Sequence, residues 1–263
     1  MLDFFFDIPL LLAAVIIIGS LCLFAMLGLL YVRRRVIPRL RITTSDSEFS
    51  GSMLQAVLVF YGLAVALMAV NVLQSYNDVS KIVSGEVTAV NMIYRDVTSY
   101  PEPIRTQLQD QLRLYVQDII QVAWPMQANG EVPVNGIRIM TEFQVILTSF
   151  EPTTEGQKLL HGEALRAYNN LIEARRLRLD SVGTQLPGIM WTVIIMGAFI
   201  GLTTSFFFKV EDSKLHSIQV LLLAIFIGLV IFMIVALDQP FRGDLGLTAE
   251  PYQLLYDQLM KVK

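Results

Sequence analysis

The sequence has very few of the side chains from which enzymes build active sites. It contains two histidines, His161 and His216, and one cysteine, Cys22. A nucleophile with an adjacent base, or a closed zinc site, cannot be assembled from so few residues. Sequence signatures of hydrolases, metalloproteases and nucleotide-binding loops are also absent. The chain is therefore not expected to be an enzyme, and neither a metal nor another cofactor is predicted.

Charged residues are scarce as well. They make up 16% of the 263 residues, whereas hydrophobic residues make up 54%. The formal net charge is −3, and no soluble segment has a contiguous basic face, so no nucleic-acid partner is expected. A mean hydropathy of +0.56 is typical of a polytopic protein whose partner is the lipid bilayer.

Four apolar runs contain no Asp, Glu, Lys, Arg or His and are long enough to cross a membrane. About 20 helical residues span the roughly 30 Å hydrocarbon core of a bilayer. The first run follows Asp3 and Asp7, where a signal peptide would carry basic residues, so it is expected to be a retained helix. The predicted spans are residues 9–32, 53–73, 188–208 and 217–237.

The segment between the second and third spans has the pattern of several amphipathic helices. Its apolar residues recur at steps of three and four, as at Val79, Val83, Val87 and Val90, which is the period of a helix with one buried face. Segments that contain proline and glycine are predicted to separate these helices. These breakers lie at 100–103, 124–136 and 151–156.

A single long helix is predicted to leave the second span and enter this segment. No proline occurs between residues 53 and 100, and a helix of that length would extend about 70 Å at 1.5 Å per residue. Gly62 and Gly85 are the positions at which it could bend. Isolated polar residues such as Glu86 and Gln127 are interpreted as solvent-exposed.

These patterns predict an all-α polytopic membrane protein with four transmembrane helices and a helical soluble bundle inserted between the second and the third. A tail with a short amphipathic helix follows the last span. The predicted segments are 1–73 for two spans and an arginine-rich loop, 74–187 for the bundle, 188–237 for two more spans, and 238–263 for the tail.

The distribution of basic residues predicts the orientation. An excess of Lys and Arg in short loops marks the cytoplasmic side, and both the first and the third loop are basic. The bundle and both termini are then expected on the outer face. Arg175, Arg176 and Arg178 oppose this assignment, but long translocated segments largely escape the rule. The loop residues concerned are Arg33, Arg34, Arg35, Arg39, Arg41, Lys209 and Lys214.

One face of the second span is a candidate pore lining. It changes from apolar to amide to acid as it leaves the membrane, and channel pores combine apolar constrictions with polar or charged rings. The simpler alternative is that Asn71 and Gln74 mark the interfacial end of the helix. The face comprises Phe60, Ala64, Leu67, Asn71, Gln74 and Asp78, at steps of four and three.

A polar corner follows the last span, where Pro240 ends the helix and Gly243 permits a turn. Repeated around an oligomer, Asp238, Arg242 and Asp244 could ring the mouth of a pore. The simpler alternative is a helix stop followed by a tail that docks on the bundle or lies at the membrane interface.

Small residues four apart predict close packing between helices in lipid. Gly197 and Gly201 have this spacing in the third span, and Ala224 and Gly228 have it in the fourth. The spacing alone does not distinguish packing within one chain from packing between subunits, and packing within the chain is the favoured interpretation.

The order of these features resembles that of the bacterial bestrophin-like membrane proteins. The likeness covers nearly the whole chain and rests on the two-plus-two spans around a helical insert and on three short motifs. By comparison with bestrophins, which are pentameric calcium-gated anion channels, it implies an oligomeric ion channel in the bacterial inner (plasma) membrane. No acidic loop here matches a calcium clasp. The motifs are WP at 124–125, ARRLRL at 174–179 ahead of Pro187 and Trp191, and LDQPFRG at 237–243.

Two functions remain open. The first is a homo-oligomeric channel for an unspecified ion, with the second span lining the pore and the bundle periplasmic or extracellular. The second is a non-conducting scaffold or sensor whose bundle binds a partner or an envelope component. A channel needs the candidate face turned to a central axis, whereas a scaffold is expected to bury it. A proton-coupled carrier or voltage sensor is disfavoured because the spans lack ionisable residues.

Overall fold

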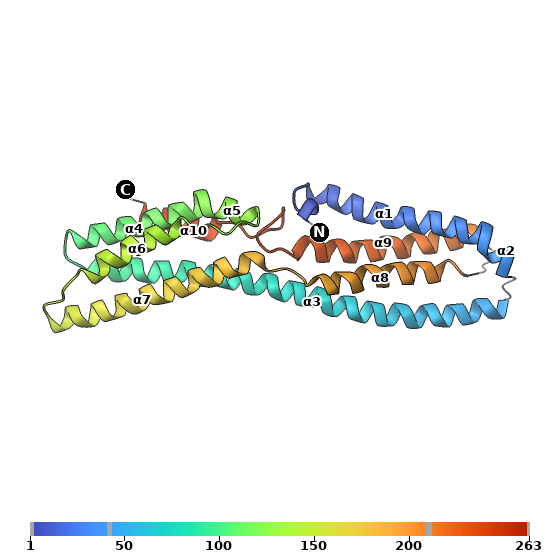
Figure 1. Cartoon of the computed structure of the whole chain (residues 1–263), viewed down its shortest axis with the longest axis horizontal. Coiled ribbons are helices and arrows are strands. Elements are labelled where there is room, and N and C mark those ends of the chain that lie inside the picture. The colour runs from blue at the N-terminus through green and yellow to red at the C-terminus, as the bar shows by residue number, and fades with distance from the viewer. Residues whose placement is uncertain (1–2, 41–43, 209–211, 262–263) are drawn as a thin grey trace. The chain divides into compact units, whose positions relative to one another are not determined.

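The computed structural model describes residues 3–40, 44–208 and 212–261, and no strand occurs among them. Arg41 and Lys209, which contributed to the predicted orientation, lie outside these residues. The chain divides into two units, which we call the membrane unit (Met1–Gln74 and Gln185–Asp238) and the bundle unit (Ser75–Thr184 and Gln239–Lys263). Both are built from helices, which confirms the predicted all-α class (Figure 1).

The membrane unit contains the four predicted spans, which are confirmed as helices long and apolar enough to cross a membrane. In its core, α1 packs along α9. The spans are α1 (Leu10–Tyr31), the first half of α3 (Thr44–Asp96), α8 (Gly188–Ser205) and α9 (Ser213–Leu237). A 3-10 turn η1 (Asp3–Phe5) precedes α1, and a π-helical turn η2 (Val32–Val36) and α2 (Ile37–Leu40) follow it.

Small residues allow the spans to approach closely. A Cβ added at Gly228 of α9 would lie 3.1 Å from the backbone of Ile18 in α1. In the same way, a Cβ at Gly197 of α8 would collide with the ring of Tyr61 in α3. Gly201 meets Leu58 of α3 and Ala224 is fully buried. These four residues therefore lie at helix contacts within one chain.

The bundle unit is formed by helices that follow the predicted breakers, with one exception. The helix predicted to end at Trp124 continues to Ala128, with Pro125 in the first turn of α5, directly after the π-helical turn η4. The elements are the second half of α3, η3 (Val97–Ser99), α4 (Ile104–Asp118), η4 (Ile119–Ala123), α5 (Trp124–Ala128), α6 (Gly136–Thr148), α7 (Glu155–Asp180), η5 (Ser181–Gly183), α10 (Glu250–Leu255) and η6 (Tyr256–Met260).

Helix α3 is uninterrupted from Thr44 to Asp96, as predicted, and neither Gly62 nor Gly85 breaks it. It contributes buried residues to each unit, for example Val65 and Val72 to the membrane unit and Val79 and Val83 to the bundle unit.

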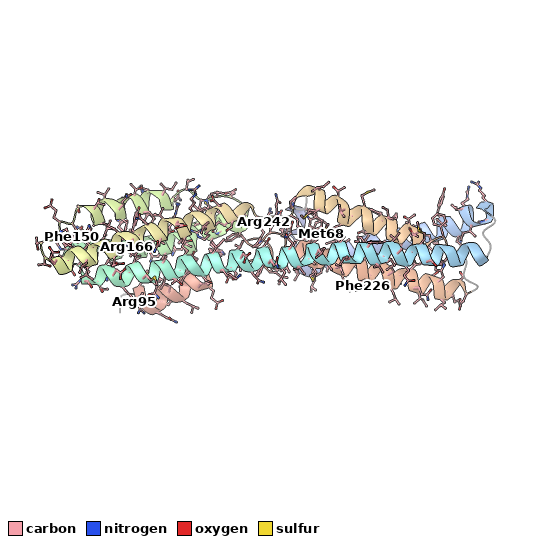
Figure 2. The ribbon with its side chains drawn as sticks, turned by 90° about the horizontal axis from the view of Figure 1, so that it is seen from below. Met68, Arg95, Phe150, Arg166, Phe226 and Arg242 are labelled. Atoms are coloured by element: carbon pink, nitrogen blue, oxygen red, sulfur yellow. The ribbon has the colours of Figure 1, made fainter. Side chains whose placement is uncertain are left out.

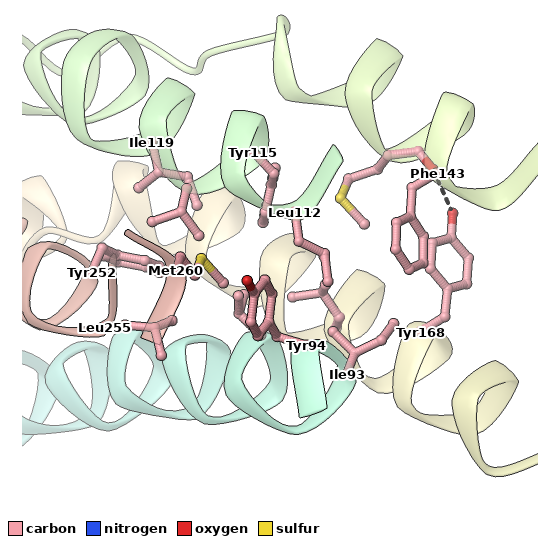
Figure 3. Packing of buried hydrophobic residues seen from close by; sticks show 14 of the residues in the cluster. Ile93, Tyr94, Leu112, Tyr115, Ile119, Phe143, Tyr168, Tyr252, Leu255 and Met260 are labelled. Atoms are coloured by element: carbon pink, nitrogen blue, oxygen red, sulfur yellow. Dashed lines mark hydrogen bonds between the residues drawn. The ribbon is translucent and has the colours of Figure 1, made fainter. Parts of the chain in front are cut away.

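The C-terminal tail is part of the bundle core. Tyr252, Leu255 and Met260 are buried among residues of α3 and α4 (Figure 3). Side-chain hydrogen bonds hold the tail backbone. Tyr76 Oη donates to the Leu245 carbonyl at 3.1 Å, Trp124 Nε1 to the Leu247 carbonyl at 3.0 Å, and Arg113 Nε to the Met260 carbonyl at 2.9 Å. Of the two predicted positions for the tail, docking on the bundle is the one observed.

A buried ion pair joins distant parts of the bundle unit. Glu86 of α3 is 0% exposed and Arg178 of α7 is 1% exposed. Arg178 Nε lies 2.5 Å from Glu86 Oε2, and Arg178 Nη2 donates to Oε1 at 3.2 Å. The third nitrogen, Nη1, donates to Gln127 Oε1 at 2.9 Å. The expectation that Glu86 and Gln127 face solvent is therefore wrong.

Two tyrosines complete the coordination of the Glu86 carboxylate. Tyr115 of α4 donates to Oε1 at 2.5 Å, and Tyr252 of the tail donates to Oε2 at 3.0 Å. Burial raises the pKa of both hydroxyls well above the ordinary value, and the negative charge of Glu86 adds to the shift. Both tyrosines therefore remain protonated donors, and the Glu86 carboxylate accepts hydrogen bonds from three residues, Arg178, Tyr115 and Tyr252.

Replacing Arg178 by methionine is expected to destabilise the full chain strongly. The change leaves a buried carboxylate without its counter-charge, a loss that typically costs about 3–5 kcal/mol. Glu86→Leu combined with Arg178→Met is expected to recover part of that loss, since neither charge then remains buried. The measurement is the thermal unfolding midpoint in detergent.

Arg176→Met is the matched control, because Arg176 lies on the same helix but is exposed in a pair with Asp180. An exposed pair of this kind contributes about 0–1 kcal/mol. Equal midpoints for Arg178→Met and Arg176→Met would contradict a structural role for the buried pair.

Gly228→Leu is expected to lower the unfolding midpoint of the chain, since the larger side chain has to displace the Ile18 backbone of α1. Overpacking of this kind costs about 1–3 kcal/mol. Gly19→Leu in α1 is the control, because a Cβ at Gly19 meets no atom within 4 Å. If both variants melt alike, the α1–α9 contact does not depend on Gly228.

Candidate functional site

The predicted pore-lining face lies on the outer surface of α3. Phe60 is 74% exposed and Leu67 is 65% exposed. Asn71, Gln74 and Asp78 are exposed too, and Ala64 is half-buried. The chain itself therefore does not cover this face.

A different face of α3 makes the contacts with the membrane unit. Val65 and Val72 are buried in its core, and Met68 packs against that core (Figure 2). The Tyr61 hydroxyl donates to the Ile194 carbonyl of α8 at 3.2 Å. These contacts hold the helix in one rotational setting and leave the candidate face free.

Polarity distinguishes the candidate face from other exposed surfaces of the membrane unit. Large apolar residues are also exposed on the other spans, for example Leu11 of α1 and Phe226 of α9, which is labelled in Figure 2. Such exposure is expected for helices in lipid. The candidate face differs because two exposed amides, Asn71 and Gln74, lie three residues apart after its apolar residues, whereas α9 carries the single exposed amide of Gln219. A polar group placed in hydrocarbon without a hydrogen-bond partner is unfavourable, so this part of the face suits contact with water or another subunit.

Both signs of charge occur where the face continues in the bundle unit. Lys81 Nζ donates to Asp78 Oδ1 at 2.9 Å, and both side chains are exposed. Exposed pairs of this type are weak, so the Asp78 carboxylate remains available to ions in solution.

Asp238 forms a structural tie within the membrane unit. Its side chain is 5% exposed. Oδ1 accepts a hydrogen bond from the Leu186 backbone N–H at 2.7 Å, and Oδ2 accepts one from Trp191 Nε1 at 3.3 Å. Burial raises the pKa of Asp238, while the two hydrogen bonds oppose that rise. The carboxylate therefore joins the end of α9 to the segment that begins α8, and we assign it this role in place of a pore mouth.

The other two residues of the corner belong to the bundle unit. Arg242 is half-buried and donates from Nη1 to Gln239 Oε1 at 3.2 Å, whereas Asp244 is exposed. Gly243 between them has a φ of 74°, a conformation that favours glycine and confirms the predicted turn.

An additional polar cluster lies at η2, directly after α1, and no local sequence pattern predicts it. Arg33 contacts the Ser213 hydroxyl, and its Nη2 lies 3.3 Å from His216 Nδ1. The other ring nitrogen, His216 Nε2, lies 3.0 Å from the Ser205 carbonyl. An Nε2 that donates to this carbonyl leaves Nδ1 as the acceptor for Arg33. The cluster connects η2 to α8 and α9, while Arg34 and Arg35 remain exposed.

No group of three or more His, Cys, Asp or Glu side chains is placed to hold a metal ion within residues 3–40, 44–208 and 212–261. The candidate site considered further is the exposed face of α3, where apolar, amide and carboxylate side chains follow one another.

Comparison with solved structures identifies the fold. A bacterial bestrophin homolog from Klebsiella pneumoniae, crystallised as a point mutant, aligns with a TM-score of 0.71 at 7% identity over 94% of this chain and 99% of that chain. Another point mutant of a homolog from this organism aligns with a TM-score of 0.61 at 10% identity, covering 95% and 99% of the two chains. A crystal structure described as a membrane protein aligns with a TM-score of 0.68 at 7% identity, covering 93% and 97%.

At the level of sequence, a search of curated proteins finds no match. The sequence pattern of the Bestrophin-like domain matches residues 12–252, which include nearly all of the first span, the other three spans and most of the bundle unit. The chain therefore belongs to the Bestrophin-like domain family.

Proposed function

We propose that the chain is one subunit of a homo-oligomeric ion channel in which α3 lines the pore. The observation that carries this proposal is the exposed face of α3, which the subunit does not cover with its own helices. Membership of the Bestrophin-like family supports it, since bestrophins, which the sequence resembles, are ion channels.

The order of side chains along the face supports conduction in physical terms. Phe60 and Leu67, repeated around an axis, would form apolar constrictions of the kind that gate by excluding water. The amides of Asn71 and Gln74 would then offer both donors and acceptors to a passing ion and its water. Asp78 would add a ring of carboxylates beyond them. The ion itself is left open by this arrangement, because amides accommodate either sign of charge.

The alternative is a non-conducting scaffold or sensor that binds a partner through the bundle unit. It is favoured by a groove of about 620 Å³ between α3 and α7, lined by small residues such as Gly85, Ala89 and Ala167. A scaffold, however, has no need for an exposed amide-bearing face on a membrane span. The channel is therefore the proposal we retain.

We further propose that the protein lies in the bacterial inner membrane with the bundle unit on the outer side. The support is the basic composition of the loop after α1, where Arg34, Arg35 and Arg39 are exposed. Of the arginines that oppose this orientation, Arg178 is neutralised by Glu86 in the folded bundle.

Asn71→Leu is expected to lower ion flux through the protein reconstituted in liposomes. Replacing an amide in the pore with an apolar side chain removes its hydrogen bonds to water, and a fall of about tenfold corresponds to a barrier raised by about 1.4 kcal/mol.

Asp78→Asn is expected to change the ratio of cation to anion flux, because it removes a ring of negative charge.

Gln219→Leu is the matched control, since Gln219 is an exposed amide on α9 that the proposal places outside the pore. Its flux is expected to equal that of the unmodified protein. Absence of flux under several ions and voltages, or equal flux for Asn71→Leu and Gln219→Leu, would overturn the proposal that α3 lines an ion-conducting pore.

The orientation is tested by cysteine labelling in a Cys22→Ala background. Glu131→Cys lies in the exposed connection before α6 of the bundle unit, and Arg39→Cys lies in α2, in the basic loop after the first span. A membrane-impermeant maleimide is expected to label Glu131→Cys in intact cells and Arg39→Cys only after the membrane is opened. The reverse pattern would place the bundle unit in the cytoplasm.

A further inference from the structure

We propose that the membrane unit holds one acyl chain of a bilayer phospholipid in an apolar groove formed by α1, α8 and α9. The groove has a volume of about 190 Å³. It lies wholly within the membrane unit and is separate from the candidate face of α3. Its lining residues are Phe5, Ile17, Ser20, Leu21, Ile195, Ala198, Phe199, Ile231 and Val235.

The groove has a buried floor and a partly exposed rim. Ile17, Leu21, Ala198, Ile231 and Val235 are buried and form the floor. The rim residues, by contrast, are half-buried or exposed, and they come from η1, α1 and α8. The opening therefore lies on the outer surface of the spans, where a membrane helix meets lipid tails.

Aromatic rings form part of the wall. Phe199 at the rim packs edge-to-face against Phe24 of α1, with ring centroids 4.8 Å apart and an interplanar angle of 86°. This pair joins α1 to α8 beside the groove, and Phe5 of η1 contributes a further ring. The space is consequently framed by fixed side chains from three segments of the chain.

The chemistry of the lining selects an apolar occupant. Ser20 is the only polar side chain that lines the groove, and its hydroxyl donates to the Ile17 carbonyl of its own helix at 2.8 Å. A buried water needs about two to four polar partners, and apolar cavities of similar size remain dry and bind hydrocarbons. Water is therefore disfavoured in the groove, and a hydrocarbon chain is favoured.

Shape and setting favour a lipid chain over a second copy of the protein. A helix of a second copy is about 10–12 Å across with its side chains, so it could place only single side chains in this groove. A single acyl chain is thin and flexible and can lie along the groove. The spans are the part of the molecule that is immersed in such chains. A phospholipid tail can thus enter from the side without leaving the bilayer.

Native mass spectrometry of the full chain tests the proposal. The protein is purified in detergent with 1-palmitoyl-2-oleoyl-phosphatidylglycerol as the probe, and the adducts retained on activation are weighed. Ser20→Phe fills the groove from its exposed rim, and Ala198→Leu fills it from the floor. Each is expected to reduce the phospholipid adduct by about tenfold, a change equivalent to about 1.4 kcal/mol.

Val193→Phe is the matched control, because Val193 is exposed on α8 and does not line the groove. It is expected to retain the adduct. Ser20→Phe adds bulk at an exposed position, so it remains informative if Ala198→Leu fails to fold. Equal adducts in all variants, no adduct in the unmodified chain, or an adduct with the mass of a free fatty acid would overturn the proposal. A change of oligomeric mass in the groove variants, without a lipid adduct in the unmodified chain, would instead assign the groove to a subunit interface.

Discussion

The continuity of α3 constrains both units of the protein. One unbroken helix runs from Thr44 to Asp96, so residues seven positions apart keep nearly the same direction along it. Val65 and Val72 are buried in the membrane unit on this face, and Glu86 and Ile93 are buried in the bundle unit. The residues turned away from this face have no partner surface in either core, which leaves Phe60, Leu67 and the amides beyond them exposed. Within the membrane unit, the stripe of α3 that contains Val65 and Val72 is therefore buried, and the stripe that contains Phe60 and Leu67 is exposed.

The bundle unit depends on complete satisfaction of one buried charge. Hydrogen bonds from Arg178, Tyr115 and Tyr252 reach both oxygens of Glu86. These donors come from α7, α4 and the C-terminal tail, so the carboxylate is satisfied only when three separate segments have assembled. A buried pair of this kind contributes little net stability relative to apolar residues of the same volume, but loss of one partner is costly. The pair therefore favours the correct arrangement of α4, α7 and the tail over other arrangements, and it adds little to the free energy of unfolding.

Much of the fold could be predicted, because its signals are local. Each span is a continuous apolar run, and α3 lacks any proline, so both follow from neighbouring residues. The candidate face of α3 could also be predicted, because its residues recur at steps of four and three along the helix. Glu86 was misinterpreted because it occupies a position in the apolar stripe between Val83 and Val90, where its burial depends on a partner that is not adjacent in sequence. One signal in the sequence could have predicted the pair. Glu86 lies on the apolar stripe of one helix, and Arg178, seven residues after Leu171, lies on the apolar stripe of another.

The sequence by itself determined which segments are helical and which can lie in lipid, because helix period and hydrocarbon thickness act on consecutive residues. Only the tertiary structure decided which polar side chains are buried. Glu86 meets Arg178 across 92 positions of the chain, and Asp238 meets the Leu186 backbone across 52. Burial of a charge is favourable only where a distant donor reaches it, so its role depends on the packing of segments that no local pattern specifies. The same reason separates Asp238, which is tied into the membrane unit, from Asp78, which remains exposed on the candidate face.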